Sequence, residues 1–410
     1  MESKRVVITG LGTINPLGDS VEETWKNLCE KKSGIKKIEG FDPEIPSRIA
    51  GQVVGFNSGD YFHRKEARKM DLYCQYALAS AIKAMADADL KKIDPHKLGV
   101  ITGTGIGGMQ TYETQLQKFI SKGPRRISPF FIPMMISNIA AGRIGIQFNA
   151  KGINFNVTSA CSSSANAIGE AFRAIKFGAA DAVIACGAEA SVTPFTLSGF
   201  SVMRALSTRN DSPETASRPF DKNRDGFVLS EGAATLILEG LEHAKNRGAH
   251  IYAEIAGYGA TCDAFHITMP SPNGEGGAQA MKNALISAKI QPEEVQYINA
   301  HGTSTPLNDK SETSAIKIAF GDHAYKLKVN SSKSMLGHML GAAGAIESLI
   351  VIKSINEQKI HPSVNITTPD PDCDLDYNPD ATIDLEIEHA ITNSFGFGGH
   401  NASLVFKKYE

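Results

Sequence analysis

The stretch Ile153–Ala171 reads INFNVTSACSSSANAIGEA. At its start, apolar and polar side chains alternate, which is the pattern of a strand with one buried face. From Ser159 onward the residues are small, and apolar side chains recur at helical spacing from Ala165 to Ile175. The stretch therefore predicts a strand, a tight turn around Cys161 and a helix that is buried on one face.

Short runs of β-branched residues that end in glycine occur elsewhere in the chain, at Arg5–Gly10, Leu98–Gly103 and Asp181–Gly187. Between them lie longer segments with helical periodicity, such as Asp71–Ala86. Strands that alternate with helices are typical of α/β proteins, in which helices cover the faces of a sheet. We therefore expect an α/β architecture.

The second half of the chain repeats the strand–turn–helix pattern of the first. Val329 lies in an alternating run, and a helix rich in glycine and alanine follows it. Lys333 comes four residues after Val329, just as Cys161 comes four residues after Val157. The match predicts an internal duplication.

The two predicted halves also close alike, with GFVLSEGAATLIL from Gly226 and GFGGHNASLVF from Gly396. We expect the halves to divide near residue 250. Residues 1–250 then form an N-terminal half that carries Cys161, and residues 251–410 form the C-terminal half.

Composition and charge exclude several classes of protein. The chain has 410 residues, a net charge of −2 and a pI near 6.6, so it is not a broadly basic nucleic-acid binder. No apolar run reaches the roughly 18 residues of a membrane-spanning helix. Six cysteines without a CxxC pair favour a reducing compartment, and the strand-like run from Arg5 leaves no room for a signal peptide. We expect a cytoplasmic protein.

Cys161 is the strongest candidate for chemistry. It stands where a strand turns into a helix, so it should lie at a helix N-terminus, where unpaired N–H groups and the helix dipole lower the pKa of a thiol. Its small neighbours leave space for a substrate. The alternative is a packed structural cysteine, which is what we expect of the other five.

Two histidines occupy similar turns. His301 follows a strand-like run in INAHGTST, and His338 stands at the expected start of a helix in MLGHMLGAAG. One cysteine and two histidines at such turns predict a catalytic group. Zinc is the competing use of these residue types, but their separations lack the local spacing of zinc ligands.

Three other segments have weaker signals. Gly103–Gly108 formally matches GxGxxG, yet no ribose-binding acid follows about 20 residues later, so we expect a tight turn that borders a cavity. A nicotinamide-dependent oxidoreductase remains the alternative from another class. Gly396–Gly399 lacks the lysine of a phosphate-binding loop. His63–Lys69 concentrates basic residues, either as a solvated helix face or as a docking patch for an acidic partner.

Four motifs carry a resemblance to a known family: NVTSACSSSANAIGEA, NAHGTSTPLND, NSSKSMLGHMLGAAGAIE and NSFGFGGHN. Together they resemble the β-ketoacyl-acyl-carrier-protein synthases, in particular the elongating enzymes of type II, from Val6 to the C-terminal segment. The resemblance implies a thiolase-like duplicated fold, with a five-stranded sheet in each half and α-β-α-β-α layers. It also implies a homodimer.

The resemblance further implies an activity. It is a decarboxylative Claisen condensation, in which malonyl-acyl-carrier protein reacts with an acyl group held on Cys161 and fatty acids grow by two carbons. The implied partner is acyl-carrier protein with phosphopantetheine-linked acyl and malonyl groups. No cofactor is required, because loss of carbon dioxide drives the new bond.

The resemblance assigns roles to individual residues. Cys161 is the nucleophile, and His301 and His338 promote decarboxylation and stabilise the enolate. The backbone N–H groups of Cys161 and Phe397 form the oxyanion hole, and Phe397 gates the entrance. Lys333 and Glu347 support catalysis, and Thr303 and Thr305 bind the pantetheine arm. The acyl pocket is lined by Ile106 and Phe200, and by Phe131 from across the dimer. The residues that dock the carrier protein are Arg64, Lys65, Arg68 and Lys69.

Related activities differ at identifiable positions. Thiolases, the alternative acyltransferases, place a second cysteine in the C-terminal glycine-rich loop, but Gly396–Asn401 contains none. Initiating synthases use Cys-His-Asn, whereas the third position here is His338. A noncatalytic partner subunit would have lost the nucleophile, and Cys161 is present.

Overall fold

The computed structural model describes residues 4–42, 44–378 and 381–410. In these residues one sheet has the strand order β10-β9-β13-β14-β8-β1-β7-β6-β4-β5. The strands in that order are β10 (Lys328–Asn330), β9 (Tyr297–Asn299), β13 (His389–Gly396), β14 (His400–Lys407), β8 (Ala253–Cys262), β1 (Val6–Ile14), β7 (Gly232–Gly240), β6 (Ala182–Glu189), β4 (Leu98–Gly103) and β5 (Asn154–Val157). Two small sheets pair β2 (Ile35–Lys37) with β3 (Ile49–Gly51), and β11 (Lys359–Ile360) with β12 (Ile383–Asp384).

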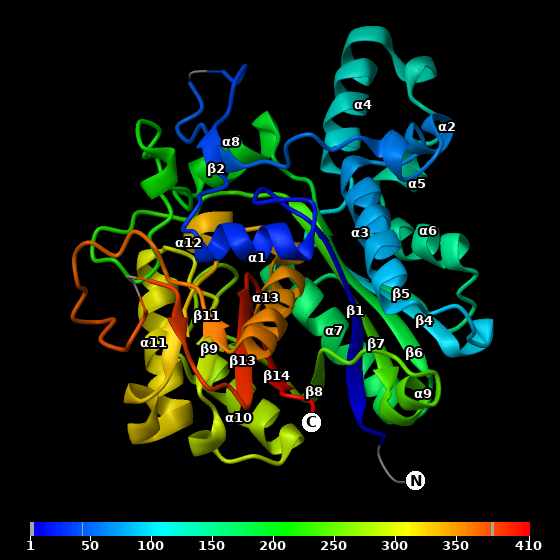
Figure 1. The fold of residues 1–410 in the computed structure, drawn as a ribbon. Helices are drawn as coiled ribbons and strands as arrows, with labels where there is room; N and C mark the ends of the chain where they lie inside the picture. Colours follow the sequence, from blue (N-terminus) through cyan, green and yellow to red (C-terminus); the bar gives the residue numbers. More distant parts are fainter. Residues whose placement is uncertain (1–3, 43, 379–380) are drawn as a thin grey trace.

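The helices lie on both faces of the strands and between them (Figure 1). They are α1 (Val21–Cys29), α2 (Arg64–Ala67), α3 (Leu72–Ala88), α4 (Met109–Lys122), α5 (Phe131–Met135), α6 (Ile139–Phe148), α7 (Ser163–Lys176), α8 (Pro194–Val202), α9 (Leu241–Asn246), α10 (Glu275–Ala288), α11 (Pro306–Phe320), α12 (Lys333–Leu336) and α13 (Ala343–Glu357). Among the residues described, no helix is long and apolar enough to cross a membrane.

The order and direction of the strands repeat. In the first half, β1, β7 and β6 pair antiparallel, and β4 and β5 continue in parallel. In the second half, β8, β14 and β13 pair antiparallel, and β9 and β10 continue in parallel. Val6–Ile8 of β1 pairs with Ala253–Ile255 of β8, so the two five-stranded arrays join into one sheet. A division at residue 250 falls between α9 and β8 and stays a prediction.

The layers follow the predicted fold. Helices α3 and α6 pack with β4, β6 and β7 in one outer core, while α7 and α13 pack together in the central core. Helices α10 and α11 cover the second-half strands on the other outer face, at the lower left of Figure 1. The sequence of layers is therefore α-β-α-β-α.

Glycines allow the outer helices to approach the strands closely, at matching places in the two halves. A Cβ on Gly12 of β1 would lie 2.3 Å from the carbonyl oxygen of Ser80 in α3. A Cβ on Gly259 of β8 would lie 2.1 Å from the carbonyl oxygen of Ala280 in α10. Real side chains do not fit in these spaces, so glycine sets the helix–strand distance in both halves.

The two strand–turn–helix units match in a register that differs from the predicted one. Ala160, in the short 3₁₀ turn Ala160–Ser162 before α7, has φ 51°, and Leu340, in the 3₁₀ turn Leu340–Ala342 before α13, has φ 45°. Cys161 therefore corresponds to Gly341, and the predicted match of Lys333 with Cys161 is wrong. The reason is that helix α12 is inserted between β10 and the second turn.

Candidate active site

A cavity of about 530 Å³ opens beside the turn at Cys161. Cys161, His301 and His338 all line it, and one ligand atom from each side chain lies within 4.8 Å of the other two. These residues come from both halves of the chain. The fold thus brings together the three residues that the sequence singled out.

Cys161 is held at the N-terminal end of α7 by an unusual backbone conformation. The left-handed conformation of Ala160 turns the chain sharply between β5 and α7, and the Cys161 side chain faces the cavity. The glycine-rich C-terminal loop packs against this turn, because a Cβ on Gly396 would lie 2.7 Å from the Ser159 carbonyl oxygen. The next backbone N–H, from Phe397, donates a hydrogen bond to the Cys161 thiol.

The thiol is more weakly acidic than its position at a helix N-terminus predicts. Burial raises the pKa of Cys161 to about 12, while the Lys333 charge and the Phe397 N–H act in the opposite direction. The expected lowering of the pKa is therefore wrong for this closed site. A buried thiolate is costly, because the apolar surroundings replace the water that would solvate its charge.

His301 follows β9 directly and is fixed through its backbone. The N–H groups of His301 and Gly302 donate to the two carboxylate oxygens of Glu312, each at 2.8 Å. Glu312 projects from α11 and is buried. Sequence reasoning did not single out Glu312, although it stands in the segment after the predicted histidine turn.

His338 lies in an extended segment between α12 and the second 3₁₀ turn, and not at the start of a helix as predicted. Its N–H donates to the Val228 carbonyl oxygen at 2.7 Å, and its own carbonyl accepts from Ser230 at 2.9 Å. The Phe227 ring packs edge-on against the imidazole, with centroids 5.3 Å apart. The segment Phe227–Ser230 therefore sets where His338 stands.

Both imidazoles are neutral at physiological pH. Burial lowers the pKa of His301 and of His338 well below the usual value, and the nearby Lys333 charge lowers both further. In the described part of the chain, neither Nδ1 atom has a hydrogen-bond partner. A neutral imidazole carries one N–H, so each ring can donate one hydrogen bond and accept another.

Lys333 and Glu347 form an ion pair beneath the site, between α12 and α13. Both side chains are only 2% exposed. Burial raises the pKa of Glu347 to about 7, and Lys333 opposes this shift. Neither residue lines the cavity, so the Lys333 charge acts on Cys161 and the histidines from outside it.

The predicted binding residues fall into two groups. Ile106, Phe200, Thr303, Thr305 and Phe397 line the cavity. The Thr303 and Thr305 hydroxyl oxygens lie 2.9 Å apart, and the Phe200 ring packs on Phe227 at 5.3 Å. Phe131 stands on α5 outside this cavity, so a single chain does not bring it to the site.

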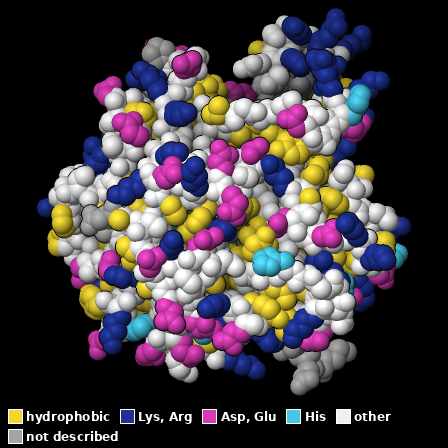
Figure 2. Space-filling model, in the orientation of Figure 1, with side chains coloured by type: hydrophobic (Ala, Val, Ile, Leu, Met, Phe, Trp, Pro, Cys, Tyr) yellow, Lys and Arg dark blue, Asp and Glu magenta, His cyan; other side chains and the backbone are white. Residues whose placement is uncertain are grey.

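The basic segment lies on the surface, away from the cavity. Arg64, Lys65 and Arg68 are exposed on and next to α2, whereas Lys69 pairs with Glu66 at 2.8 Å. Figure 2 shows lysine and arginine side chains gathered at the upper right, over the region of α2 and α4.

Glu189, at the end of β6, is a site residue that sequence reasoning missed. Its side chain is fully buried and accepts hydrogen bonds from the N–H groups of Gly105, Ile106 and Gly341. It therefore joins the first-half loop that borders the cavity to the second-half turn. Gly105 and Ile106 line the cavity, so the predicted position of Gly103–Gly108 beside a cavity is confirmed. The one signal for Glu189 was an acid at the end of an apolar strand.

The Cys161, His301 and His338 side chains are also of the types that bind zinc. However, the Lys333 charge acts on both histidines and disfavours a divalent cation beside them. The arrangement is better suited to a thiol nucleophile with two neutral hydrogen-bonding imidazoles.

Comparison with known proteins identifies relatives over the whole chain. The family models described as the N-terminal and C-terminal domains of beta-ketoacyl synthase match residues 3–244 and 252–367. The 3-oxoacyl-[acyl-carrier-protein] synthase 2 of Staphylococcus aureus is 51% identical over 412 aligned residues, which cover 100% of this chain and 99% of the relative. The enzyme of the same name from Synechocystis sp. is 49% identical over 413, with the same coverage.

Solved structures agree with these matches. A type II polyketide ketosynthase, bound to the hexaketide and in complex with its acyl-carrier protein, is 38% identical, with full coverage of both chains and a TM-score of 0.91. The ishigamide ketosynthase/chain length factor is 33% identical, with full coverage of both chains and a TM-score of 0.94.

Proposed function

The chain belongs to the β-ketoacyl synthase family, and from this premise we propose how its residues elongate an acyl chain. It is a condensing acyltransferase of the 3-oxoacyl-acyl-carrier-protein synthase class. We propose that it joins malonyl-acyl-carrier protein to an acyl group on Cys161 and lengthens fatty acids by two carbons. The observation that carries this proposal is the convergence of Cys161, His301 and His338 in one cavity.

The first half-reaction is thioester exchange. The Cys161 sulfur attacks the carbonyl carbon of an acyl thioester, the bond to the carrier sulfur breaks, and the thiol proton ends on the departing carrier thiol. The backbone N–H groups of Cys161 and Phe397 would stabilise the tetrahedral oxyanion. The packing of Gly396 against the Cys161 turn supports this assignment, because it holds the two N–H groups near each other.

The second half-reaction forms the carbon–carbon bond. The malonyl thioester loses carbon dioxide, and the electron pair left behind forms an enolate. His301 and His338 would donate hydrogen bonds to the enolate oxygen, as their neutral state allows. The enolate carbon then attacks the acyl carbonyl, the bond to Cys161 breaks, and the released thiolate takes up a proton. This chemistry balances without a cofactor.

The other cavity residues would bind the substrate. Thr303 and Thr305 would hydrogen-bond the phosphopantetheine arm, and Ile106 and Phe200 would line the acyl pocket. The Lys333–Glu347 pair would support the catalytic residues electrostatically. Phe397 stands in the glycine-rich loop and would gate the entrance.

A homodimer would complete the acyl pocket with Phe131. Helices α4 and α5 and the edge strand β5 lie on one side of the molecule (Figure 1). Large apolar side chains are exposed on them, among them Phe119, Ile120, Ile132 and Phe155. Such an exposed apolar face next to an open sheet edge is typical of a subunit interface. A second copy bound there would bring the α5 segments of the two chains together.

Acyl-carrier protein is the proposed macromolecular partner. A related ketosynthase is known in complex with its acyl-carrier protein. We propose that Arg64, Lys65, Arg68 and Lys69 contact the acidic carrier, because exposed basic side chains cluster over α2. We also propose that the two halves divide at residue 250 and that the protein works in the cytoplasm, where its six free cysteines would stay reduced.

The direct test is an elongation assay with a series of acyl-carrier-protein thioesters and malonyl-carrier protein. The proposal predicts products two carbons longer than each donor, with release of one carbon dioxide per product. Condensation of two unactivated acyl thioesters without malonyl groups would instead indicate thiolase activity. Nicotinamide-dependent turnover would indicate an oxidoreductase and overturn the proposal.

A further inference from the structure

The turn that carries Thr303 and Thr305 is strained. Gly302 and Ser304 both have positive φ, 36° and 67°. Ser304 has a side chain, so this left-handed conformation costs energy and persists only where neighbouring groups hold it. The positions of the flanking threonine hydroxyls therefore depend on what holds the turn.

A first-half segment, Arg218–Gly226, holds this second-half turn. The Arg218 N–H donates to the Ser304 hydroxyl oxygen at 2.9 Å, and the Gly226 N–H donates to the Ser304 carbonyl at 3.1 Å. Both contacts fall on the strained residue. Residues Arg218–Gly226 therefore hold the Gly302–Ser304 turn through two hydrogen bonds to Ser304.

Within Arg218–Gly226, the side chain of Arg224 also contacts the backbone of the turn. Its guanidinium Nε donates to the Thr305 carbonyl at 3.1 Å, and Nη2 donates to the Pro306 carbonyl at 3.0 Å. It also lies 3.6 Å from Asp309, whose carboxylate accepts the Thr303 N–H at 3.0 Å. The Arg224 side chain is only 4% exposed and does not line the cavity. It acts on Thr305 through the backbone carbonyl of that residue, and on Thr303 through Asp309.

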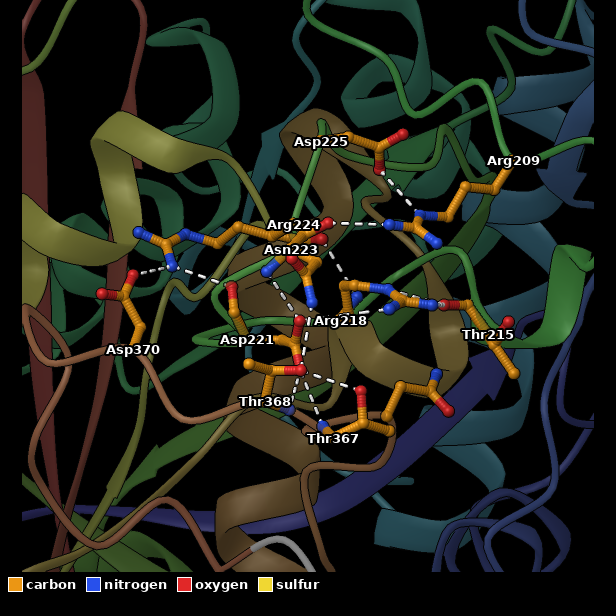
Figure 3. Close-up of polar contacts among 12 residues, drawn as sticks. Arg209, Thr215, Arg218, Asp221, Asn223, Arg224, Asp225, Thr367, Thr368 and Asp370 are labelled. Carbon is orange, nitrogen blue, oxygen red and sulfur yellow. Dashed lines mark hydrogen bonds and ion pairs between the residues drawn. The ribbon is translucent and has the colours of Figure 1, made fainter.

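The other side of Arg224 is anchored on a third segment. Nη1 donates to the Asp221 carbonyl at 2.9 Å and to the Asp370 carboxylate. The Asp221 carboxylate accepts the N–H groups of Thr367 and Thr368. Figure 3 shows Arg224 extending toward Asp370, away from Arg218, while the Asp221 carboxylate meets the two threonines. The guanidinium is therefore fixed in place before any substrate binds.

We propose that Arg224 is a positioning residue for the phosphopantetheine arm, acting through the Thr303–Pro306 backbone. The inference rests on the proposed function, in which the Thr303 and Thr305 hydroxyls bind that arm. A lysine would keep the positive charge, but its single ammonium cannot serve three carbonyls and two carboxylates in the planar geometry of a guanidinium. Arg224→Lys should therefore loosen the turn while keeping the ion pair with Asp370.

The test compares two acyl donors that differ only in the arm. Decanoyl-pantetheine carries the polar arm, and the decanoyl thioester of ethanethiol lacks it. The rate at which each donor acylates Cys161 is followed by intact-protein mass, and the ratio of the two rates is the readout. A merely structural role would slow both donors alike and leave the ratio unchanged.

We expect Arg224→Lys to lower the ratio about fivefold or more, the effect of losing a hydrogen bond. Asp370→Asn, which removes the negative charge that anchors the guanidinium and leaves Arg224 in place, should shift the ratio in the same direction. Thr303→Val should lower the ratio by itself. Adding Arg224→Lys to Thr303→Val should then lower it by less than Arg224→Lys does alone, because the two changes act on one contact.

The matched control is Arg247→Lys. Arg247 is also an arginine paired with a buried carboxylate, that of Glu239, although its own side chain is 19% exposed, and it follows α9 outside the cavity. It should leave the ratio at the wild-type value. The inference about Arg224 is overturned if Thr303→Val lowers the ratio but neither Arg224→Lys nor Asp370→Asn changes it. The proposed function would stand in that case. Failure of wild-type protein to be acylated by either donor overturns the proposed function and the inference with it.

Discussion

The imidazole rings of His301 and His338 lie 5.3 Å apart between centroids and cross at 84°. The two residues come from separate segments, one following β9 and the other held against Val228–Ser230. Their edge-to-face arrangement brings two hydrogen-bonding groups to one region of the cavity beside Cys161. Two donors that converge in this way suit an oxygen on which negative charge develops.

The neutrality of these histidines predicts that neither imidazole contributes an inflection to the pH profile of decarboxylation between pH 8 and 6. Burial and the Lys333 charge hold both pKa values well below the usual 6.5, so neither ring gains a proton as pH falls from 8 to 6. The rate should be measured in Cys161→Ala, where thiol titration is absent. Because burial raises the pKa of Glu312 and of Glu347 to about 7, ring protonation is read directly from the imidazole NMR signals. A ring that gains a proton between pH 8 and 6 would contradict the assigned neutral state.

Replacing one member of the Lys333–Glu347 pair should lower the free energy of unfolding more than replacing both members. Lys333→Met leaves Glu347 buried without its partner, and breaking such a pair costs about 3–5 kcal/mol of unfolding free energy. The double change Lys333→Met/Glu347→Gln should restore much of that loss, because no uncompensated charge remains. Urea unfolding of the three proteins measures this. Equal losses in the single and double variants would show that the pair is not coupled.

The position of Ile106 in the cavity predicts that this side chain limits the length of the acyl donor. Ile106→Phe adds bulk where the acyl chain should end, and overpacking a filled site costs about 1–3 kcal/mol. Twelve-carbon donors should therefore lose elongation rate, while six-carbon donors are spared. Ile106→Val is the control, since it adds no bulk. Equal losses for both donors would reject the placement of Ile106 in the acyl pocket.

The basic segment predicts an effect that depends on the carrier. Lys65→Glu/Arg68→Glu should raise the KM for carrier-protein substrates through lost electrostatic attraction, and added salt should mimic this change. Pantetheine thioesters should be affected far less. The charge-matched control is Lys245→Glu/Lys289→Glu, which lies near α9 and α10, at the opposite end of the molecule from α2 (Figure 1). If KM rises equally for carrier-protein and pantetheine substrates, the basic segment contributes to folding and does not dock the carrier.

The catalytic candidates could be predicted from the sequence because each stands where a regular element ends. Cys161, His301 and His338 interrupt recognisable strand–turn or helix patterns among glycines, and such turns are where side chains reach a cavity. Helix α3 was predictable for the same kind of reason. Its apolar spacing begins directly after Asp71, whose carboxylate accepts the Tyr73 N–H as an N-cap.

The supporting residues could not be predicted, because their partners are distant along the chain. Glu189 binds Gly341, and Arg224 binds Pro306 and Asp370, and no local pattern announces such contacts. The register of the repeat failed for a related reason. An inserted helix, α12, occupies the place after β10 where the first half has its turn directly. The pKa of Cys161 depends on burial by the whole fold, which a helix N-terminus alone does not reveal.

The central claim is that Cys161 and His338 serve different half-reactions, and it can be tested by measuring both in the same variants. Acyl-Cys161 is detected by intact-protein mass, and labelled carbon dioxide release reports decarboxylation of malonyl-carrier protein. His250→Ala, a change at an exposed histidine, is the control. It should leave both half-reactions at wild-type rates.

Cys161→Ala should release carbon dioxide without forming any β-ketoacyl product, since decarboxylation needs only the bound malonyl thioester and the two imidazoles. His338→Ala should still be acylated at Cys161, while its decarboxylation falls by roughly two to three powers of ten, the usual effect of removing one oxyanion donor. Normal decarboxylation by His338→Ala, or condensation by Cys161→Ala, would contradict the account.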